Sequence, residues 1–264
     1  MADLARSRIP NPKSLVISGA SSGIGLALAR HYLEHGATVA AFARRGDLLQ
    51  NLAAEFPGKV YGYTLDVRDG PAIQRAAADF MSRAGVPDIV IANAGVSRGT
   101  LTEYAEDEEV FQNIMDINVL GMVKTFQPFH AAMREARRGT LVGISSVAGF
   151  RGLPGSGAYS ASKAAAISYL ESLRVELYGS GVKVVTICPG YIKTPMTDVN
   201  TYPMPFILEA DIAANRIARV IGQGVSFAVV PWQMGLAGWV LRRLPNWIYD
   251  SIFSKAPHKS RNKQ

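Results

Sequence analysis

The chain has 264 residues, of which 48% are hydrophobic and 19% charged, with 25 Gly and a single Cys. This composition excludes a disordered, collagen-like or coiled-coil polymer, and the length suits one α/β domain. The net charge of +7 is local: positions 212–264 hold eight Lys or Arg against one acid, which leaves 20 basic and 20 acidic residues in positions 1–211. A neutral body argues against an extended nucleic-acid-binding face, so no nucleic-acid partner is predicted.

The single cysteine and the N-terminal segment indicate the cellular compartment, and the spacing of the histidines bears on metal binding. Cys188 has no partner for an internal disulfide, and residues 1–14 lack the apolar core of a signal peptide. We therefore expect a reducing, cytoplasmic environment. Cys188 lies in an apolar run, which favours a buried thiol over a nucleophile. The four histidines show no metal-ligand spacing, so no metal is predicted.

Short apolar runs alternate with segments of helical spacing. The runs that predict strands are Ser14–Ser18, Thr38–Ala43, Lys59–Leu65, Asp88–Ala92, Gly139–Ser145 and Val182–Cys188. Nearly uncharged strands separated by helices need cover on both faces of a sheet. This pattern predicts a doubly wound, mostly parallel Rossmann-type α/β fold, with a single domain over residues 1–254. The basic tail, residues 255–264, is expected to be disordered.

The segment Val220–Leu241 contains 22 consecutive residues without a charge, which is long enough to raise the question of a membrane span. Glycines, glutamines and Pro231 interrupt it, and they favour a different interpretation. We expect a buried strand over Val225–Val230, closed by Pro231, and a helix from about Gln233 to Leu244.

The first chemical signal follows the first predicted strand. Gly19-Ala20-Ser21-Ser22-Gly23-Ile24-Gly25 lies between that strand and a helical pattern over Leu26–Glu34. Glycines permit a tight turn and a close backbone approach, and the N-terminus of a helix stabilises negative charge. A glycine-rich loop alone is weak evidence, but this strand–loop–helix context predicts a pyrophosphate site.

The spacing G-x-x-x-G-x-G resembles that of the short-chain dehydrogenase/reductase family, and further motifs of that family occur in order between residues 12 and 220. They are Asp66-Val67, Asn93-Ala94-Gly95, Asn118-Val119, Ser146, Tyr159-Ser160-Ala161-Ser162-Lys163 and Pro189-Gly190. The family most often has Thr where this chain has Ser18, which keeps the hydroxyl.

The resemblance implies a role for each cofactor-binding motif. The pyrophosphate would lie on the loop formed by Gly19, Ser21, Ser22, Gly23, Ile24 and Gly25. Asp66 and Val67 would contact the adenine, and Asn93, Ala94 and Gly95 would let the ribose approach, with Asn93 also tying neighbouring strands together. Pro189, Gly190, Ile192 and Thr194 would orient the nicotinamide for transfer of its pro-S hydrogen.

The end of the second predicted strand bears on the choice of cofactor. An acid there would accept hydrogen bonds from the ribose hydroxyls of NAD and repel a 2′-phosphate. This chain instead has Arg44 and Arg45, and guanidinium groups bind phosphate in a bidentate fork. We predict NADP(H) over NAD(H); the alternative is that both arginines are solvated loop charges.

Tyr159 and Lys163 are four residues apart in a segment of helical character, so both side chains emerge from one face. A nearby ammonium stabilises a phenolate, which makes proton transfer by a phenol feasible. The resemblance implies that Ser146 polarises the substrate carbonyl, that Tyr159 exchanges the proton, and that Lys163 also holds the nicotinamide ribose. Asn118 would position a water for proton relay, and Ser145 is the competing serine.

Residues 195–212 occupy the position of the family's substrate-covering segment. The part from Pro195 to Leu208 is apolar and punctuated by prolines, with no Arg or Lys between Thr194 and Leu208, which suits a small lipophilic ketone, aldehyde or alcohol. The extension over residues 231–254 combines aromatic and basic side chains. These could bind a membrane surface, form a subunit contact or cover the substrate pocket.

Together these features predict an oxidoreductase that transfers a hydride between NADP(H) and a lipophilic alcohol or carbonyl compound. The resemblance to the family implies a homodimer or homotetramer. Two other hypotheses remain: an NADP-binding redox sensor without turnover, and a membrane-surface protein for which the dehydrogenase fold serves as scaffold.

Overall fold

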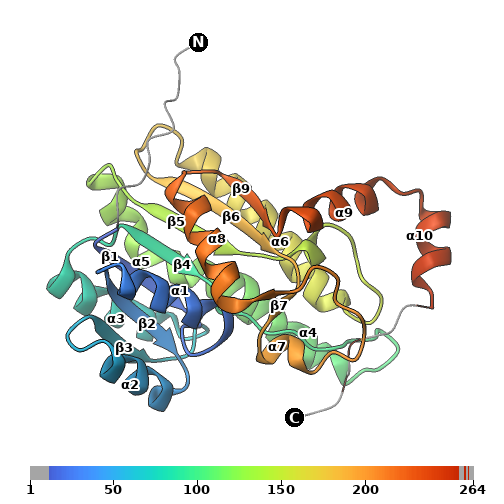
Figure 1. Ribbon diagram of the computed structural model, residues 1–264, viewed down its shortest axis with the longest axis horizontal. Helices are drawn as coiled ribbons and strands as arrows, with labels where there is room; N and C mark the ends of the chain where they lie inside the picture. Colours follow the sequence, from blue (N-terminus) through green and yellow to red (C-terminus); the bar gives the residue numbers. More distant parts are fainter. Residues whose placement is uncertain (1–11, 256–258, 260, 262–264) are drawn as a thin grey trace.

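A computed structural model describes residues 12–255, 259 and 261 (Figure 1). At its centre lies a seven-stranded sheet whose neighbouring strands are all parallel, in the order β3-β2-β1-β4-β5-β6-β9. The strands are β1 (Ser14–Ser18), β2 (Thr38–Ala43), β3 (Val60–Thr64), β4 (Ile89–Ala92), β5 (Thr140–Ile144), β6 (Lys183–Pro189) and β9 (Phe227–Val230). The predicted doubly wound fold is confirmed, and each predicted strand forms within two residues of its expected ends.

Helices cover both faces of the sheet. One face carries α1 (Gly23–Glu34), α2 (Gly46–Glu55) and α8 (Ala210–Gly222). The other carries α3 (Gly70–Ala84), α5 (Gly121–Glu135) and α6 (Gly157–Glu176). Alternate strand residues belong to the two cores, as Leu15 and Ile17 face α1 while Val16 faces the opposite layer. Because both faces of the inner strands are buried, these strands need apolar side chains on both sides, which explains their nearly uncharged sequences.

Shorter elements surround the carboxyl edge of the sheet. Helix α4 (Asp107–Met115) runs into a π-helical turn, η1 (Asp116–Leu120), before α5, and a 3₁₀ turn, η2 (Val147–Gly149), follows β5. The small strands β7 (Ile192–Lys193) and β8 (Leu208–Glu209) pair in parallel. They hold together the two ends of the segment between them, which includes α7 (Pro195–Asp198).

The C-terminal extension forms two further helices, α9 (Trp232–Arg243) and α10 (Asn246–Phe253), which extend beyond the sheet on one side (Figure 1). The predicted strand and helix on either side of Pro231 are therefore present. Among residues 12–255, 259 and 261, no helix is long and apolar enough to cross a membrane.

Two residues of the basic tail have described contacts. Lys259 donates to the hydroxyl of Ser97, and Arg261 forms an ion pair with Asp107. The prediction of a disordered tail otherwise concerns residues 256–258, 260 and 262–264, which lie outside the described part of the chain.

Candidate active site

The predicted site residues gather at one edge of the sheet, because most of them follow the carboxyl end of a parallel strand and the others lie on η1 and α6 beside that edge. From β1 the strand order continues through β2 and β3 on one side, and through β4, β5 and β6 on the other. The strand order therefore reverses direction between β1 and β4. Such a switch point opens a crevice in doubly wound sheets. A cleft of about 400 Å³ lies here, lined both by the glycine loop and by Ser146, Tyr159 and Lys163.

The glycine loop fits a group that must approach the backbone closely. Gly19 and Gly23 have positive φ angles of 71° and 55°, which glycine adopts without strain. Gly25 lies in the first turn of α1, where a Cβ would lie 2.2 Å from the carbonyl oxygen of Gly19. Side chains at these positions would distort the turn. Because all three residues are glycines, the backbone N–H groups at the N-terminus of α1 remain accessible to an anion.

Asn93 ties β1 to β4, as the sequence predicted. Its amide nitrogen donates to the carbonyl oxygens of Ser18 and Gly19 at 3.1 and 3.2 Å. In return, the Ser18 hydroxyl accepts from the backbone N–H groups of Asn93 and Ala94 at 3.2 and 3.3 Å. The serine hydroxyl therefore makes the interstrand contacts for which a hydroxyl-bearing residue is needed, and the main role of Asn93 is to fix the crevice.

The two arginines after β2 both line the cleft, but they differ in their contacts. Arg45 donates to the hydroxyls of Ser21 and Ser22 at 2.9 and 2.7 Å, so its guanidinium lies over the glycine loop. Arg44 is exposed, and its charge contributes to lowering the pKa of Asp66. The larger cause of that lower pKa is the hydrogen bond that Asp66 accepts from the Arg68 side chain. This edge of the cleft therefore carries a net positive charge.

Tyr159 lies in the first turn of α6 and faces Ser146, at the end of β5. Burial is the main influence on the Tyr159 phenol and raises its pKa, while a hydrogen bond with the Ser146 side chain lowers it. Ser146 also accepts from the backbone N–H of Ala148 at 3.1 Å, which fixes its position. The structure thus brings together the two hydroxyls that the sequence singled out.

Lys163 projects from the next turn of α6 into the same cleft. Its ammonium group lies 5.7 Å from the centre of the Tyr159 ring and donates to the carbonyl oxygen of Ile144 at 3.0 Å. Lys163 is only 4% exposed, and this burial lowers its pKa to about 8. It therefore remains largely protonated at neutral pH, and its positive charge favours the ionised form of a neighbouring phenol.

Asn118 lies in the π-helical turn, close to Lys163 across Gly95. A Cβ at Gly95 would lie 3.2 Å from the Asn118 side-chain oxygen and 3.6 Å from the Lys163 ammonium. The Asn118 side chain accepts from the N–H of Val96 at 2.8 Å and donates to the Val96 carbonyl and the Ser162 hydroxyl at 3.0 and 2.9 Å. These hydrogen bonds hold the segment after β4 against α6.

The competing serine and the cysteine have structural roles. Ser145 is buried, and its hydroxyl donates to the carbonyl oxygen of Lys163 at 2.8 Å, which fastens β5 to α6. Cys188 is fully buried in β6, and this burial raises the pKa of its thiol to about 12. A thiol with this pKa is a poor nucleophile at neutral pH. Within the described part of the chain, no group of three or more His, Cys, Asp or Glu side chains could hold a metal ion.

The segment after β6 closes the other side of the cleft. Pro189, Gly190, Ile192 and Thr194 all line it, together with Met196 on the covering segment. Thr194 caps α7 in a reciprocal capping box with Thr197. Within the range 195–212, predicted as the covering segment, α7 forms first, β8 begins at Leu208 and α8 begins at Ala210.

The C-terminal extension packs beside this site, which the sequence left as one of three alternatives. A Cβ at Gly190 would lie 2.6 Å from Cγ of Met234 in α9. Arg151 donates to the carbonyl oxygens of Leu241 and Leu244, and its guanidinium lies 3.8 Å from the centre of the Tyr249 ring. The inner face of the extension thus covers the loop that follows Ser146.

Sequence reasoning missed Arg151, Met234 and Lys259, because their importance arises from contacts between segments far apart in the chain. Lys259 donates to the Ser97 hydroxyl at 3.0 Å and to the carbonyl oxygen of Met196 at 3.4 Å. A cationic side chain therefore lies at the covering segment, although none occurs between Thr194 and Leu208. A single basic residue in a distant tail carries no sequence signal for such a contact.

The residues present fit a nicotinamide dinucleotide. A glycine loop at a helix N-terminus suits a pyrophosphate, and the continuous cleft extends from Arg44 to Tyr159 and Lys163. When bound, such a cofactor supplies or accepts the hydride. The phenol, the serine hydroxyl and the ammonium of this chain can then hold a carbonyl oxygen and move its proton.

Comparisons with known proteins agree with this geometry. The family model of the short-chain dehydrogenases matches residues 13–203. An uncharacterised oxidoreductase of Myxococcus xanthus is 39% identical over 244 residues, covering 90% of this chain and 95% of that protein. A 2-dehydro-3-deoxy-L-rhamnonate dehydrogenase (NAD(+)) of a Sphingomonas strain is 34% identical over 205 residues, covering 78% and 82%.

A solved structure has the same architecture across almost the whole chain. It is a short-chain dehydrogenase from Burkholderia cenocepacia in complex with NADP, 25% identical, with a TM-score of 0.80 over 95% of this chain and all of that one. The matching family model, the shared fold and the Ser146, Tyr159 and Lys163 cluster lead to one assignment. This chain belongs to the short-chain dehydrogenase/reductase family of oxidoreductases.

Proposed function

We propose that this protein transfers a hydride reversibly between NADP(H) and a small lipophilic alcohol, ketone or aldehyde. The observation that carries the proposal is the joint presence of the glycine loop and the Ser146, Tyr159 and Lys163 side chains in one continuous cleft. A dinucleotide site and a proton-transfer group side by side are the two parts that hydride transfer to a carbonyl requires.

The side chains have distinct roles in this proposal. In reduction, the Ser146 hydroxyl donates a hydrogen bond to the substrate carbonyl oxygen, and the Tyr159 phenol donates the proton as that oxygen gains negative charge. In oxidation the proton returns to Tyr159. The Lys163 ammonium favours the phenolate in both directions and also holds the ribose next to the nicotinamide. Asn118 connects this ammonium, through water, with the outside of the cleft.

The preference for NADP(H) is supported by charge. Arg44 and Arg45 follow β2, no acid stands at that position, and Arg45 is already held by Ser21 and Ser22. Family members of both kinds occur among the comparisons, one named for NAD and one solved with NADP. The proposal therefore rests on the two arginines of this chain, since guanidinium groups attract a 2′-phosphate.

A lipophilic substrate is supported by the side chains of the covering segment. Met196, Phe206 and Ile207 are apolar and exposed, and Tyr202 is close enough to Tyr159 to contribute to raising its pKa. A carbonyl compound lying between this segment and Tyr159 would contact mainly apolar surface, which suits an aliphatic, steroid-like or aromatic carbonyl.

The complete set of proton-transfer side chains disfavours a redox sensor without turnover. Such a protein would need the dinucleotide loop alone, whereas this chain also buries a lysine beside the tyrosine at a cost in stability. Burying a cation costs free energy, and titratable groups buried at such a cost cluster at functional sites.

The test is a screen for NADPH consumption with steroid, retinoid, acyl and aromatic carbonyl compounds. We expect at least one lipophilic class to be reduced, with a lower KM than short hydrophilic carbonyls show. A protein that binds NADPH but consumes it with none of these compounds would contradict the proposed function and support the sensor.

A membrane-surface role for the outer face of the C-terminal extension is also part of the proposal. All three tryptophans of the chain lie there, and Trp232, Trp239 and Trp247 are 69%, 55% and 74% exposed. In α9, Trp232, Leu236, Trp239, Val240 and Arg243 recur at helical spacing and form one exposed face. Arg243 lies over Trp239, 4.1 Å from the ring centre, and α9 contains no acid.

A face with tryptophan and arginine suits an anionic lipid surface, where the rings occupy the interface and the cations meet the headgroups. The opposite face of α9 is already buried against Gly190 and Phe150. The exposed face is therefore not needed for packing within this chain. A second copy of the chain, in the predicted homodimer or homotetramer, is the competing occupant.

A further inference from the structure

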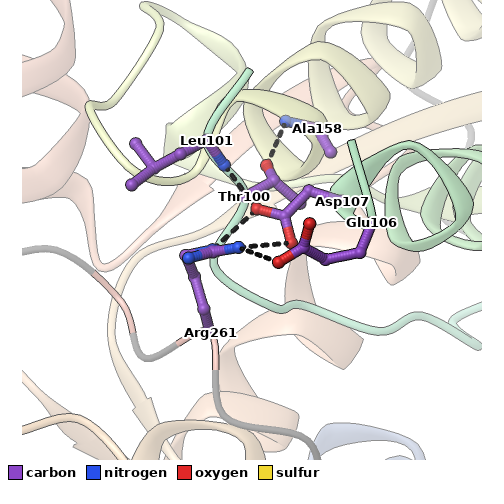
Figure 2. Close-up of polar contacts among 6 residues, drawn as sticks. All are labelled: Thr100, Leu101, Glu106, Asp107, Ala158 and Arg261. Carbon is purple, nitrogen blue, oxygen red and sulfur yellow. Dashed lines mark hydrogen bonds and ion pairs between the residues drawn. The ribbon is translucent and has the colours of Figure 1, made fainter. Parts of the chain in front are cut away.

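The C-terminal tail carries a contact that neither the family motifs nor the proposed chemistry explains. Arg261 donates to both oxygens of Asp107, at 2.7 and 3.2 Å, and to Glu106 at 3.3 Å. Its guanidinium also lies 3.5 Å from the centre of the Tyr104 ring. Figure 2 shows the guanidinium of Arg261 directed at the two carboxylates. We call Tyr104, Glu106 and Asp107 the arginine socket.

The arginine socket is built into the body of the protein. Asp107 is only 8% exposed, and its carboxylate also accepts from the backbone N–H of Leu101 at 2.8 Å. Its position at the start of α4 adds the favourable field of a helix N-terminus. The hydrogen bond from Arg261 lowers the pKa of Asp107, so the pair is charged at neutral pH. A shielded pair with several hydrogen bonds and a stacked ring can order a tail that an exposed ion pair could not.

The arginine socket is also connected to the catalytic helix. The loop residue Thr100 donates its backbone N–H to Gly155 at 3.0 Å, and its hydroxyl accepts from the N–H of Ala158 at 3.3 Å. Ala158 immediately precedes Tyr159. Figure 2 shows Thr100 between the arginine socket and this turn of α6.

Lys259, two residues before the anchor, lies where the tail meets the mouth of the cleft. Its ammonium donates to Ser97, in the loop after β4, and to the carbonyl oxygen of Met196 on the covering segment. Met196 and Val96, the neighbour of Ser97, both line the cleft. Lys259 therefore joins two segments that contribute to the lining of the cleft.

We propose that Lys259 and Arg261 form part of the wall of the substrate site: Arg261 is anchored in the arginine socket, and Lys259 joins the covering segment to the loop after β4. Arg261 acts as a positioning residue, and Lys259 sets the width of the entrance. The effect on substrate rests on the proposed hydride transfer, whereas the anchoring does not.

The test compares Arg261→Gln with Lys255→Gln, an exposed residue of the same tail, as the matched control. We expect Arg261→Gln to raise KM for the carbonyl substrate about fivefold or more, with kcat and the affinity for NADPH within twofold of the parent. Hydrogen exchange over residues 100–107 should become faster in this variant, and Lys255→Gln should change neither quantity.

A second variant separates the bridge from the anchor. Lys259→Met removes the ammonium but keeps Arg261, so KM should rise while exchange over residues 100–107 remains at the parent level. Unchanged exchange in Arg261→Gln would overturn the anchoring, and faster exchange with an unchanged KM would overturn the role at the substrate entrance. If the parent protein shows no turnover, the proposed function fails, and the exchange measurement alone still decides whether the tail is anchored.

Discussion

At the residue scale, the proposed preference for NADP(H) depends on the two arginines after β2. Arg45 is held over the glycine loop by two hydroxyls, while Arg44 is exposed beside the acid Asp66. A charge-assisted hydrogen bond contributes about 1.5 to 3 kcal/mol. The proposed preference for a dinucleotide with a 2′-phosphate rests on hydrogen bonds of this kind from the two guanidinium groups.

We therefore expect the double variant Arg44→Asp, Arg45→Ala to lose about 10- to 100-fold in affinity for NADPH, because it removes two cations and introduces an acid. The affinity for NADH should change by less than a few fold. Fluorescence titration with both dinucleotides measures this ratio, and Arg30→Gln, at a surface ion pair away from the cleft, is the control. A double variant that retains the parent's ratio would mean that the arginines are solvated loop charges.

A second prediction at this scale concerns the stability of the protein, because the buried ammonium group of Lys163 opposes folding. Burial lowers its pKa from the ordinary value of 10.5 to about 8 in the folded protein. Between these values the unfolded chain binds the proton and the folded chain does not, so the free energy of unfolding rises with pH from about 8 to 10.5. Below pH 8 the cost of burying the charge is fully present.

Replacing Lys163 with Met should therefore raise the free energy of unfolding at pH 7 by about 1 to 3 kcal/mol while abolishing turnover, and the gain should shrink toward pH 10.5. Urea unfolding at pH 7 and pH 10 measures both effects. Lys124→Met removes another lysine that donates to a backbone carbonyl, but outside the cleft, and serves as control. A Lys163→Met protein that is less stable at pH 7 would show that the ammonium contributes net stability.

The residues of the site were predictable to different degrees. Tyr159 and Lys163 could be found because their spacing on a helix has a chemical use, and the glycine loop because its strand and helix are visible in the sequence. The hydrogen bonds of Asn118 to Val96 and Ser162 could not be found, because they depend on a π-helical turn that apolar spacing does not reveal.

At the element scale, the packing of α9 links the C-terminal extension to the site. Gly238 lies on the buried face of α9, where a Cβ would lie 2.3 Å from a ring carbon of Phe150. Phe150 is itself stacked on Phe227 of β9, with ring centres 6.1 Å apart. The ring therefore has little room to move, and the glycine is needed for the close approach of helix and loop.

Gly238→Ala should lower the free energy of unfolding by about 1 to 3 kcal/mol through overpacking, despite the higher helix propensity of Ala. KM for the carbonyl should rise as well, since Met234 on the same helix packs against Gly190. In the control Gly222→Ala, the added methyl meets nothing within 4 Å, and stability should be unchanged or higher by up to about 1 kcal/mol. Equal stabilities of the two variants would contradict close packing at Gly238.

The elements themselves were largely predictable. Nearly uncharged apolar runs predicted the strands to within two residues of their ends, because strands that are buried on both faces favour apolar side chains. The pair formed by β7 and β8 was not predicted, since two residues in each strand give no periodicity. Nor could the sequence decide among the three roles of the extension, because its helices are apolar on both faces.

At the scale of the whole molecule, a nearly neutral Rossmann domain is followed by the C-terminal extension, which is basic and rich in tryptophan. Its inner face packs on the loop after Ser146, and its outer face exposes all three tryptophans. An enzyme with a lipophilic substrate gains from a position at a lipid surface, because such compounds concentrate there.

We expect the full chain to sediment with vesicles that contain phosphatidylglycerol more than with neutral vesicles, and less as salt is raised. The variant Trp232→Gln, Trp239→Gln should lose most of this binding, since it removes two interfacial rings. Tyr178→Gln, which replaces an aromatic residue that is 78% exposed elsewhere, is the control. Equal vesicle binding by both variants, or a tryptophan variant that instead dissociates an oligomer in light scattering, would contradict the membrane role.

The central claim is that Tyr159 exchanges the proton with the substrate while a bound NADPH supplies the hydride, and single-turnover absorbance at 340 nm tests it most directly. Tyr159→Phe should bind NADPH as the parent does, yet reduce the carbonyl at least a hundredfold more slowly. Tyr169→Phe, a change on the same helix, should keep the parent rate. A Tyr159→Phe protein that reduces its substrate at the parent rate would contradict the account.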